Sequence, residues 1–562
     1  MAEALMGLRS RTAVVLGLIV IAGVALRSAL LGNGLWRDEA YSYFDVTTPT
    51  LGAMFEHIWW TESNPPAFFV LLRGWTELFG VSEVSLKMLP LVWSAGAIAA
   101  TYALARTCAS KSTALGAAFL LAVSTPAILF GTDVRPYAMA QCLTAVDVAL
   151  YVRAISRGDP RSLAAWVVCS IVAVFTQYIS ILLLAALALA TWLFRRALVV
   201  SWFTIAFGFC AVALAFVSWM PTFLHHVAAG EPWSRSYGPI GRLGFILAAL
   251  AWTCPASTHL PELIGSSASF VVSMMVFVFA VDAVAVRHRR GPSLPDVSAF
   301  ASPLVATTAI LSCVFVSAIG YLQIRYIVPL LPLFVVVYAD AFARLLERRP
   351  IVGRAVLALL ALEALASTAG ATGRPESGMR AVAAQARASV RGEVATWLVA
   401  PDDAAPTLAY YLRSSPVTLY GVPRWDHPEY FRVGGYLAAW KKPDLIGDAL
   451  RRVNDLACSG NTRLLFVKRF PLGTKIVDIG GLPTSRAGVL EAALRRRYAV
   501  LTEKSYDGVN EPAALVDFRL SCSRFRTKAR NGINHAAAGR SRASSTAVPK
   551  NPIQRSRRWL RA

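Results

Sequence analysis

The pair Asp38-Glu39 places two adjacent carboxylates just beyond the first hydrophobic stretch, within Gly34-Leu-Trp-Arg-Asp-Glu-Ala-Tyr-Ser-Tyr43. The stretch before it, from Thr12 to Leu31, is close to the ~20 apolar residues that cross a bilayer. The pair therefore falls at the boundary between membrane and water, where a carboxylate stays ionised and still reaches a lipid-anchored substrate. Such a carboxylate can serve as a general base. The plainer alternative is that the pair caps a helix or pairs with Arg37.

The composition indicates a polytopic α-helical membrane protein. Of the 562 residues, 56% are hydrophobic and only 16% are charged, and the mean hydropathy is +0.51. That is more apolar surface than a soluble fold buries. Arg9 and Arg11 precede the first stretch as in a signal peptide, but its apolar run is longer than a signal core and no cleavage site is obvious. We expect it to be a retained helix.

Ten further apolar stretches are long enough, or nearly so, to cross the membrane, which makes eleven expected spans. The further spans lie at about 88–105, 113–131, 137–152, 163–178, 180–194, 198–219, 266–286, 301–320, 326–343 and 352–370. Basic residues in short loops stay cytoplasmic, and six basic clusters then fall on one side: Arg9/Arg11, Arg106/Lys111, Arg153/Arg157/Arg161, Arg195/Arg196, Arg287/Arg289/Arg290 and Arg344/Arg348/Arg349. The piece at 243–254 would break this agreement, so we expect it to be re-entrant or interfacial.

The opposite, outside face carries five segments. They are the first outside loop (32–86), the turns 132–136 and 320–325, the loop 221–241 and everything after about 371. Residues 1–370 form the expected transmembrane domain. From about 375 to 525 the composition turns polar, with strand-like runs at Thr396–Ala400, Leu464–Val467 and Ala514–Phe518, which predicts a small α/β domain.

Residues 526–562 are a basic tail that we expect to be disordered and drawn to anionic surfaces. From 523 onward the chain has eleven Lys or Arg and no Asp or Glu, so this end supplies +11 of the net +23. Nucleic acid is not an expected partner, because the tail falls on the outside face and no recognition fold accompanies it. Eight scattered cysteines without a CxxC pair argue against a zinc site and a disulfide framework. Whether Cys458 and Cys522 pair stays open.

The first outside loop is too aromatic for a plain solvated loop. Trp59, Trp60, Phe68 and Phe69 are placed to sit at headgroup depth, on short helices that lie flat on the bilayer. Pro65-Pro66 is expected to end one such helix and start the next.

Four motifs in order resemble one family. They are Asp38-Glu-Ala-Tyr41, Asn64-Pro-Pro, Asp133-Val-Arg-Pro-Tyr-Ala138 and Arg325-Tyr-Ile-Val-Pro-Leu-Leu-Pro332. Together they resemble bacterial membrane glycosyltransferases of the GT-C fold, of the protein O-mannosyltransferase and aminoarabinose-transferase type (glycosyltransferase family 39-like), over residues 10–370. Family members commonly have His where this chain has Asn64, so no role of that His is carried over.

The resemblance implies an inverting sugar transfer from a polyprenyl-phosphate carrier to a lipid, glycan or protein acceptor, on the periplasmic side of the bacterial inner membrane. Asp38 matches the catalytic Asp of the family and is the expected base, while Glu39 orients backbone or acceptor. Arg135 and Arg325 are the expected phosphate ligands, because a guanidinium fork fits phosphate oxygens. The neighbouring tyrosines, Tyr137 and Tyr326, and a lesser candidate, Lys87, complete the set. The arginines alternatively only snorkel to the interface.

Three further polar sites have plainer interpretations. His57 reads as an interfacial polar residue. Asp147 lies inside an apolar span, where a charge is costly, so it needs a partner such as Gln177 or Arg153. His225-His226, with Glu231 nearby, could ligate a metal, but adjacent histidines point apart in regular structure. The sequence indicates no cofactor and no metal ligand set, and leaves a divalent metal open.

Two other classes of function remain alternatives. A transporter or flippase of a lipid-linked sugar would share the hydropathy and the buried charges, although paired internal repeats with broken spans are not apparent. A non-catalytic homologue would keep the fold as a scaffold, which the Asp38-Glu39 pair argues against. Sugar transfer from a carrier, measured against movement of the carrier alone, separates these classes.

Overall fold

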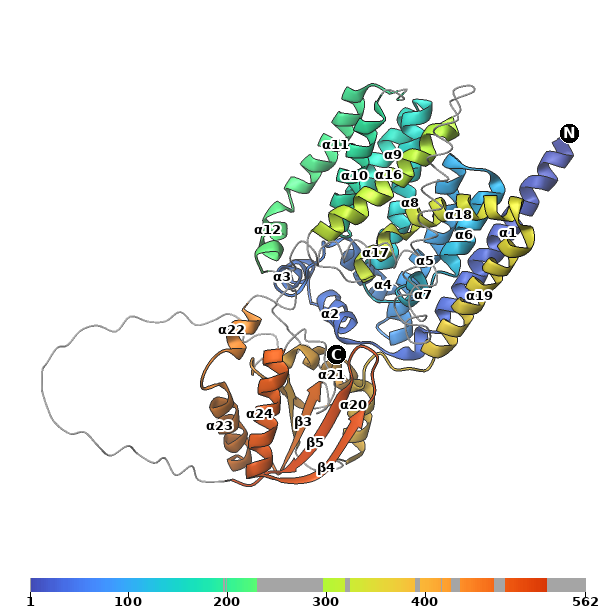
Figure 1. The fold of residues 1–562 in the computed structure, drawn as a ribbon. Helices are drawn as coiled ribbons and strands as arrows, with labels where there is room; N and C mark the ends of the chain where they lie inside the picture. The colour runs from blue at the N-terminus through green and yellow to red at the C-terminus, as the bar shows by residue number, and fades with distance from the viewer. Residues whose placement is uncertain are drawn as a thin grey trace, which may run out of the picture. The chain divides into compact units, whose positions relative to one another are not determined.

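A bundle of apolar helices makes up the first two thirds of the chain in the computed structural model (Figure 1). The structure describes residues 2–195, 198, 200–229, 297–318, 324–389, 395–415, 417–425, 435–469 and 481–522. The helices of the bundle are α1 (Ala2–Ser28), α5 (Glu83–Cys108), α6 (Lys111–Ala122), α7 (Thr125–Leu129), α8 (Tyr137–Arg157), α9 (Pro160–Val174), α10 (Ile179–Leu193), α11 (Trp202–Val217), α12 (Met220–Ala229), α16 (Val297–Ala318), α17 (Ile324–Ile327), α18 (Leu331–Arg348) and α19 (Pro350–Ala371).

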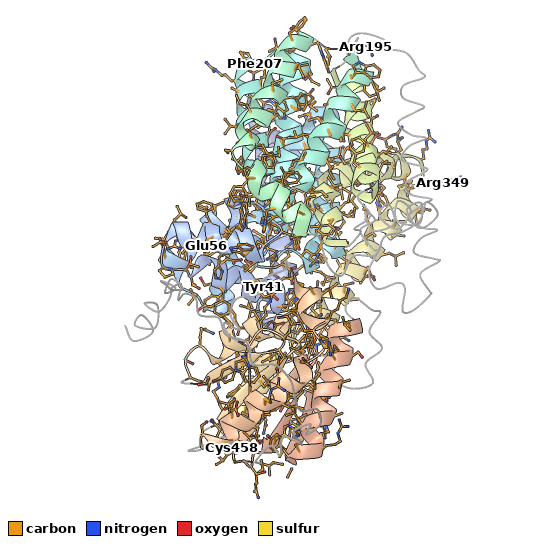
Figure 2. The ribbon with its side chains drawn as sticks, turned by 90° about the vertical axis from the view of Figure 1, so that its left-hand side faces the viewer. Tyr41, Glu56, Arg195, Phe207, Arg349 and Cys458 are labelled. Carbon is orange, nitrogen blue, oxygen red and sulfur yellow. A yellow bond between two sulfur atoms is a disulfide. The ribbon has the colours of Figure 1, made fainter. Side chains whose placement is uncertain are left out.

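The bundle has the apolar helices of a protein that crosses the membrane several times. Within the described part of the chain, five helices are long and apolar enough to span a bilayer, or six if the bent pair α11 and α12 forms one span. Four shorter apolar helices accompany them. The spanning window of α8 is 83% buried, whereas those of α1 and α19 are 17% and 22% buried. α8 is therefore a central helix, and side chains such as Phe207, 76% exposed on α11, point outward (Figure 2).

Local sequence signals explain where the helices begin and end. The Ser82 hydroxyl accepts a hydrogen bond from the Ser85 amide at the start of α5, and the Asp159 carboxylate accepts one from the Arg161 amide at the start of α9. Such caps satisfy amides that have no partner inside the helix. α8 starts after Pro136 and ends at Gly158, which adopts the left-handed conformation that favours glycine.

Ten of the eleven expected spans coincide with helices of the bundle, and the one at 266–286, like the piece at 243–254, lies outside the described residues. The expected span at 113–131 is wrong as a single helix, because α6 ends at Ala122 and α7 restarts at Thr125. Pro126 explains the break, since its ring would clash with the carbonyl of Ala122 in a continuous helix. The buried Arg27 side chain donates to that carbonyl and to the carbonyl of Leu121, at 2.9 and 3.1 Å.

Three short helices form the first outside loop: α2 (Arg37–Val46), α3 (Leu51–Thr61) and α4 (Ala67–Phe79). Pro65 and Pro66 separate α3 from α4, as expected, and Pro66 is the residue that precedes the first turn of α4. The α4 side chains Phe68 and Phe69 are fully buried, whereas Leu78 and Phe79 are 79% and 60% exposed. This helix thus has one face on the protein and one apolar face turned outward.

The C-terminal α/β region (residues 375–522) contains a five-stranded sheet of order β2-β1-β3-β5-β4. The strands are β1 (Ala395–Ala400), β2 (Thr418–Gly421), β3 (Arg463–Arg469), β4 (Ala499–Tyr506) and β5 (Ala513–Arg519), and the helices are α20 (Met379–Ser389), α21 (Ala405–Leu412), α22 (Tyr436–Trp440), α23 (Leu445–Cys458) and α24 (Gly481–Arg497). β1 pairs in parallel with β2 and with β3, and β5 pairs antiparallel with β3 and with β4. The three expected strand runs are β1, β3 and β5.

Alternate side chains of the sheet enter two different apolar cores, as the pleat of a strand requires. Trp397 and Leu465 pack with α20, α21 and the first outside loop. Leu398 and Phe466 pack with α23 and α24 on the other face. The outside loop and one face of the sheet therefore share a core, and residues up to Cys522 form one compact unit. The boundary near 375 and the tail from 526 stay predictions, and the tail lies outside the described residues.

A disulfide closes the C-terminal α/β region. Cys458, at the end of α23, is bonded to Cys522, which follows β5. The sequence left this pairing open. Five other cysteines in the described residues are free, and four of them are buried.

Candidate functional site

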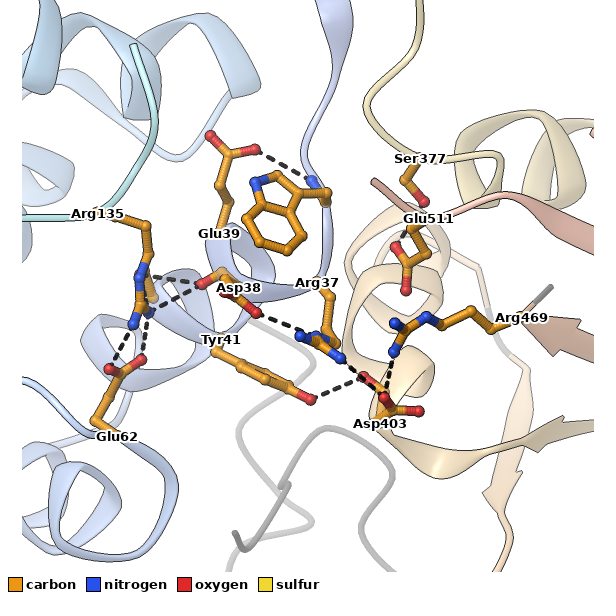
Figure 3. A network of polar contacts seen from close by, with 12 residues as sticks. Arg37, Asp38, Glu39, Tyr41, Glu62, Arg135, Ser377, Asp403, Arg469 and Glu511 are labelled. Carbon is orange, nitrogen blue, oxygen red and sulfur yellow. Dashed lines mark hydrogen bonds and ion pairs between the residues drawn. The ribbon is translucent and has the colours of Figure 1, made fainter. Parts of the chain in front are cut away.

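The acid pair lies in the first turn of α2, where its two carboxylates point in different directions (Figure 3). Glu39 occupies the third helical position and accepts a hydrogen bond at 3.1 Å from the amide of Trp36, which precedes the helix. This contact satisfies a helix-terminal amide and places negative charge at the positive end of the helix dipole. Asp38 is then directed away from Glu39, toward a group of arginines.

Glu39 is fully buried and bound on both oxygens. Its Oε1 accepts from the amide of Val134 at 3.0 Å, and the Lys87 Nζ lies 3.5 Å from the same oxygen. Burial raises the pKa of Glu39 above its ordinary value, against the opposing effect of Lys87 and the two amides. Glu39 therefore ties α2 to the turn 132–136, and its expected orienting role in the reaction stays a prediction. Lys87 is its counter-charge, with a side chain only 2% exposed.

Asp38 has a different environment, because arginines hold its carboxylate and 8% of the residue remains exposed. The Nε of Arg37 donates to Oδ1 at 3.1 Å, and the Nη1 of Arg325 donates to Oδ2 at 2.7 Å. Burial favours the neutral acid, but the positive charges of Arg37, Arg325 and Arg135 outweigh that effect and lower the pKa of Asp38 below its ordinary range. Asp38 is thus ionised at neutral pH.

Arg135 binds Glu62 with both arms of its guanidinium. Its Nη2 donates to Glu62 Oε2 at 2.8 Å, and its Nη1 donates to Glu62 Oε1 and, at 3.1 Å, to the backbone oxygen of Asp38. Nη1 also reaches the Ser42 hydroxyl at 3.2 Å. Arg135 therefore supports the backbone of α2 below the acid pair, and its fork is occupied by a carboxylate in this state.

The two predicted tyrosines flank these arginines. Tyr137 starts α8, is 3% exposed and packs edge-on against Phe130 with ring centroids 5.7 Å apart. The guanidinium of Arg325 lies over the ring of Tyr326, 5.6 Å from its centroid. The structure thus gathers the three predicted cations around α2. Arg325 contacts the Asp38 carboxylate, Arg135 contacts the Asp38 backbone oxygen, and Lys87 contacts the Glu39 carboxylate.

Three solved structures are similar to the chain over most of its length. ArnT from Cupriavidus metallidurans in the apo state matches with a TM-score of 0.58 and 15% identity, over 91% of this chain and 98% of ArnT. The same protein bound to undecaprenyl phosphate matches with a TM-score of 0.56 and 16% identity, over 90% and 98%. The oligosaccharyltransferase AglB from Archaeoglobus fulgidus, in complex with an inhibitory peptide and a dolichol-phosphate, matches with a TM-score of 0.52 and 12% identity, over 93% and 75%. The fold is that of the GT-C membrane glycosyltransferases.

A sequence family agrees with the GT-C fold. The model of the dolichyl-phosphate-mannose-protein mannosyltransferase family matches residues 63–225. The match includes Asn64-Pro-Pro and Asp133-Val-Arg-Pro-Tyr-Ala138, two of the four motifs that carried the resemblance. No curated protein matches the chain in sequence. The expected fold class, a multi-pass helical membrane protein of the GT-C fold, is confirmed, whereas the number of eleven spans and the small soluble C-terminal α/β domain stay predictions.

Two acids of this GT-C site were not singled out in the sequence. Glu62, 4% exposed, directly follows α3 and is the partner of Arg135. Burial raises its pKa, against the effect of Arg135. Asp133, 7% exposed, has its pKa raised well above the ordinary value by burial and by the charges of Glu39 and Glu376. In the sequence, Glu62 is a lone acid two residues before Asn64-Pro-Pro. Asp133 is the first residue of the motif Asp133-Val-Arg-Pro-Tyr-Ala138.

The three histidines in the described part of the chain have ordinary partners. His57 Nδ1 lies 3.1 Å from Asp45 Oδ1. His225 stacks on Trp59, with ring centroids 4.3 Å apart, and both ring nitrogens of His226 are engaged, with Tyr178 Oη at 3.0 Å and the Ile58 carbonyl at 3.1 Å. Glu231 lies outside the described residues. In the described part of the chain, no group of three or more acidic, His or Cys side chains is arranged to hold a metal ion.

Asp147 of α8 has a different partner from the two that were expected. The Ser170 hydroxyl of α9 donates to its Oδ1 at 2.5 Å. Gln177 and Arg153 were wrong, because α9 packs directly on α8 and brings Ser170 to the same level. Asp147 is therefore a buried residue of the bundle, remote from the acid pair in its contacts.

Proposed function

We propose that the protein is an inverting glycosyltransferase that moves a sugar from a polyprenyl-phosphate carrier to a lipid, glycan or protein acceptor on the periplasmic face of the bacterial inner membrane. The observation that carries the proposal is the ion pair between Asp38 and Arg325, which joins a carboxylate of the first outside loop to a cation 287 positions away. The Asp38 carboxylate can accept the proton of the acceptor hydroxyl, and the Arg325 guanidinium can bind a phosphate. The GT-C fold and the undecaprenyl phosphate in the similar ArnT structure support a lipid-linked donor.

The reaction requires both groups at once. The acceptor oxygen attacks the anomeric carbon from the side opposite the phosphate, and its proton passes to an Asp38 oxygen. The bond between the anomeric carbon and the phosphate oxygen breaks, and its electron pair leaves with the phosphate. The donor phosphodiester, with one negative charge, thereby becomes a phosphate monoester with a second charge. Arg325 stabilises that growing charge, which is larger in the transition state than in the bound donor.

The contacts of Asp38 suggest that the donor activates its own base. While Arg37 and Arg325 hold the carboxylate, its low pKa makes it a weak proton acceptor. A carrier phosphate that binds Arg325 neutralises one of these cations and so raises the pKa of Asp38. The base is then strengthened only when the donor is in place. Arg135 could bind the phosphate only if it released Glu62. We therefore assign Arg135 first to the support of the α2 backbone.

Two observations support the periplasmic side for the site. The disulfide between Cys458 and Cys522 suits an oxidising compartment. Arg195, a member of one expected cytoplasmic cluster, lies at the end of the helical bundle that faces away from Tyr41 of α2 (Figure 2).

The test is sugar transfer in reconstituted vesicles. We would supply undecaprenyl-phosphate-linked hexoses and pentoses, labelled in the sugar, together with an extract of envelope lipids and glycans as acceptors. Label should move to an acceptor with release of undecaprenyl phosphate. Movement of the intact donor across the bilayer, without transfer, would instead support the flippase alternative and overturn the proposal.

A further inference from the structure

The C-terminal α/β region reaches the acid pair through a single arginine. Arg37 divides its guanidinium between two carboxylates: its Nε donates to Asp38 at 3.1 Å, and its Nη1 donates to Oδ2 of Asp403 at 3.0 Å (Figure 3). The side chain of Arg37 is 15% exposed and that of Asp403 is 8% exposed. The two carboxylates belong to segments 365 residues apart. The α/β region therefore supplies an ion-pair partner of Arg37, the residue that holds Asp38.

The place of Asp403 follows from the topology of the sheet. It lies three residues beyond the end of β1. β1 is the strand between β2 and β3, and all three run parallel. In open α/β sheets, ligands usually bind at the carboxyl ends of the parallel strands. The usual position is beside the central strand, where the strand order reverses. Here α2 occupies that position and brings Arg37 to it.

Asp403 is held by three residues, Arg37, Arg469 and Tyr41. Arg469, at the end of the neighbouring strand β3, donates to the same Oδ2 that receives Arg37. The Tyr41 hydroxyl, from the next turn of α2, donates to the backbone oxygen of Asp403 at 2.8 Å. Glu511 is buried near Arg37 and Arg469, where their charges favour its ionised form and burial raises its pKa to about 7. Asp403 thus has little freedom, and neither does the Arg37 that it binds.

Its neighbour Asp402 shows that the contact is specific to one carboxylate. Asp402 is as buried as Asp403, at 5% exposed. Its amide donates to the Val422 carbonyl at 2.8 Å, and burial together with Asp403 raises its pKa to about 7. Among the described residues, Asp402 makes no hydrogen bond or ion pair with α2, so of this acidic pair Asp403 is the one bonded to the site.

We propose that Asp403 is a positioning residue of the transfer reaction, which sets the orientation of Asp38 by holding Arg37, and that the α/β region thereby completes the catalytic site. The inference rests on the proposed function. An arginine between two fixed carboxylates has one orientation, whereas an arginine that has lost its bond to Asp403 follows the motions of the Asp38 side chain more closely. A small displacement of a base is enough to lower turnover by about 100-fold.

The experiment is a double-mutant cycle on turnover with the full chain in vesicles. Its members are Asp403→Ala, Arg37→Ala and the double variant, all measured with the labelled undecaprenyl-phosphate-linked sugar that wild type uses. We expect Asp403→Ala to lower kcat by about 10- to 100-fold with little change in the donor KM. In the Arg37→Ala background, Asp403→Ala should lower kcat by less than about a further twofold, because the group through which Asp403 acts is already missing. Asp403→Asn keeps an acceptor oxygen for Arg37 and should recover part of the rate.

Asp517→Ala is the matched control. Asp517 is also buried and paired with an arginine, Arg463, in the same sheet, but its partner does not contact α2 in the described residues. It should lower the melting temperature without the change in kcat. Binding of undecaprenyl phosphate, measured by native mass spectrometry, shows for each variant that the site is still folded.

The outcomes separate this inference from the proposed function. Absence of any transfer by wild type, or full activity of an Asp38→Asn variant, would refute the proposed function. Wild-type kcat in Asp403→Ala, or equal losses from this substitution with and without Arg37, would overturn the positioning role while the proposed function stands. Equal losses of kcat in Asp403→Ala and Asp517→Ala would also overturn it, because they would indicate a role in folding alone.

Discussion

Asp38 and Glu39 are adjacent in the chain, but the two sides of α2 on which they lie are built differently. On the Glu39 side, backbone amides and Lys87 saturate a fully buried carboxylate. On the Asp38 side, the partners are the movable guanidinium groups of Arg37 and Arg325, and part of the residue stays exposed. Side-chain partners can exchange for a substrate, whereas backbone amides cannot. The difference fits the proposed roles, in which Asp38 serves the chemistry and Glu39 serves the fold.

The largest effect should come from the Asp38 side. We expect Asp38→Asn to lower kcat by about 1,000-fold, because a general base contributes about 10²- to 10⁴-fold. The melting temperature of the detergent-purified protein should change little, since Asn keeps the size and an acceptor oxygen. Turnover and thermal unfolding measured on the same preparation check both statements. Near-normal turnover would remove the assigned base.

Arg325→Ala should have the next largest effect, about 100-fold on turnover, because it removes one stabiliser of the leaving phosphate. It should also move the acidic limb of the pH profile upward. The cation that Asp38 loses had lowered its pKa, so the base becomes protonated at a higher pH than in wild type. A pH series of kcat/KM for both proteins gives the comparison. An unchanged acidic limb would mean that Asp38 is not the group that titrates.

Glu39→Gln should reverse the pattern, with a smaller loss of turnover and a larger loss of stability. Gln offers one acceptor oxygen where Glu39 bound two amides, and it removes the carboxylate that forms the ion pair with the buried Lys87. Breaking a buried ion pair costs about 3 kcal/mol or more. Chemical unfolding in detergent would measure it. A stable Glu39→Gln protein with the rate of Asp38→Asn would exchange the roles of the two acids.

The smallest effect is expected at Asp147, which serves as the reference for a buried acid outside the site. Asn at this position still accepts from Ser170 and removes a charge that is costly inside the membrane. We expect turnover within about twofold of wild type and a change in unfolding free energy of at most about 1 kcal/mol. A large loss of transfer, measured in the same vesicle assay, would extend the active region into the bundle.

Much of this architecture was accessible from local sequence. Apolar stretches of membrane length predicted the helices of the bundle, and Pro65-Pro66 predicted the break between α3 and α4. The break at Pro126 was missed, although the proline was visible, because hydropathy averages over it. The convergence of Asp38, Arg135 and Arg325 followed from the order of the motifs on the outside face.

The contacts that complete the site were not accessible in that way. The pair of Arg135 with Glu62 spans 73 positions, and that of Arg37 with Asp403 spans 366. Nothing in the composition around Asp403 distinguishes it from Asp402, because only the direction of the chain after β1 turns one of them toward α2. Such pairings depend on how the sheet and the loop pack together, which local patterns do not encode.

Arg469, Asp403, Arg37, Asp38 and Arg325 form a row that alternates in sign. The row carries one surplus positive charge when Glu511, which is buried near Arg37 and Arg469, is protonated. In the proposed reaction, a donor phosphodiester with a single negative charge would cancel that surplus. When Asp38 took the acceptor proton, the surplus would become two and match the phosphate monoester that had just formed. Loss of the proton from Asp38 would then leave the spent carrier with an excess negative charge beside a carboxylate. The charge count of the row would thereby couple proton release to ejection of the product.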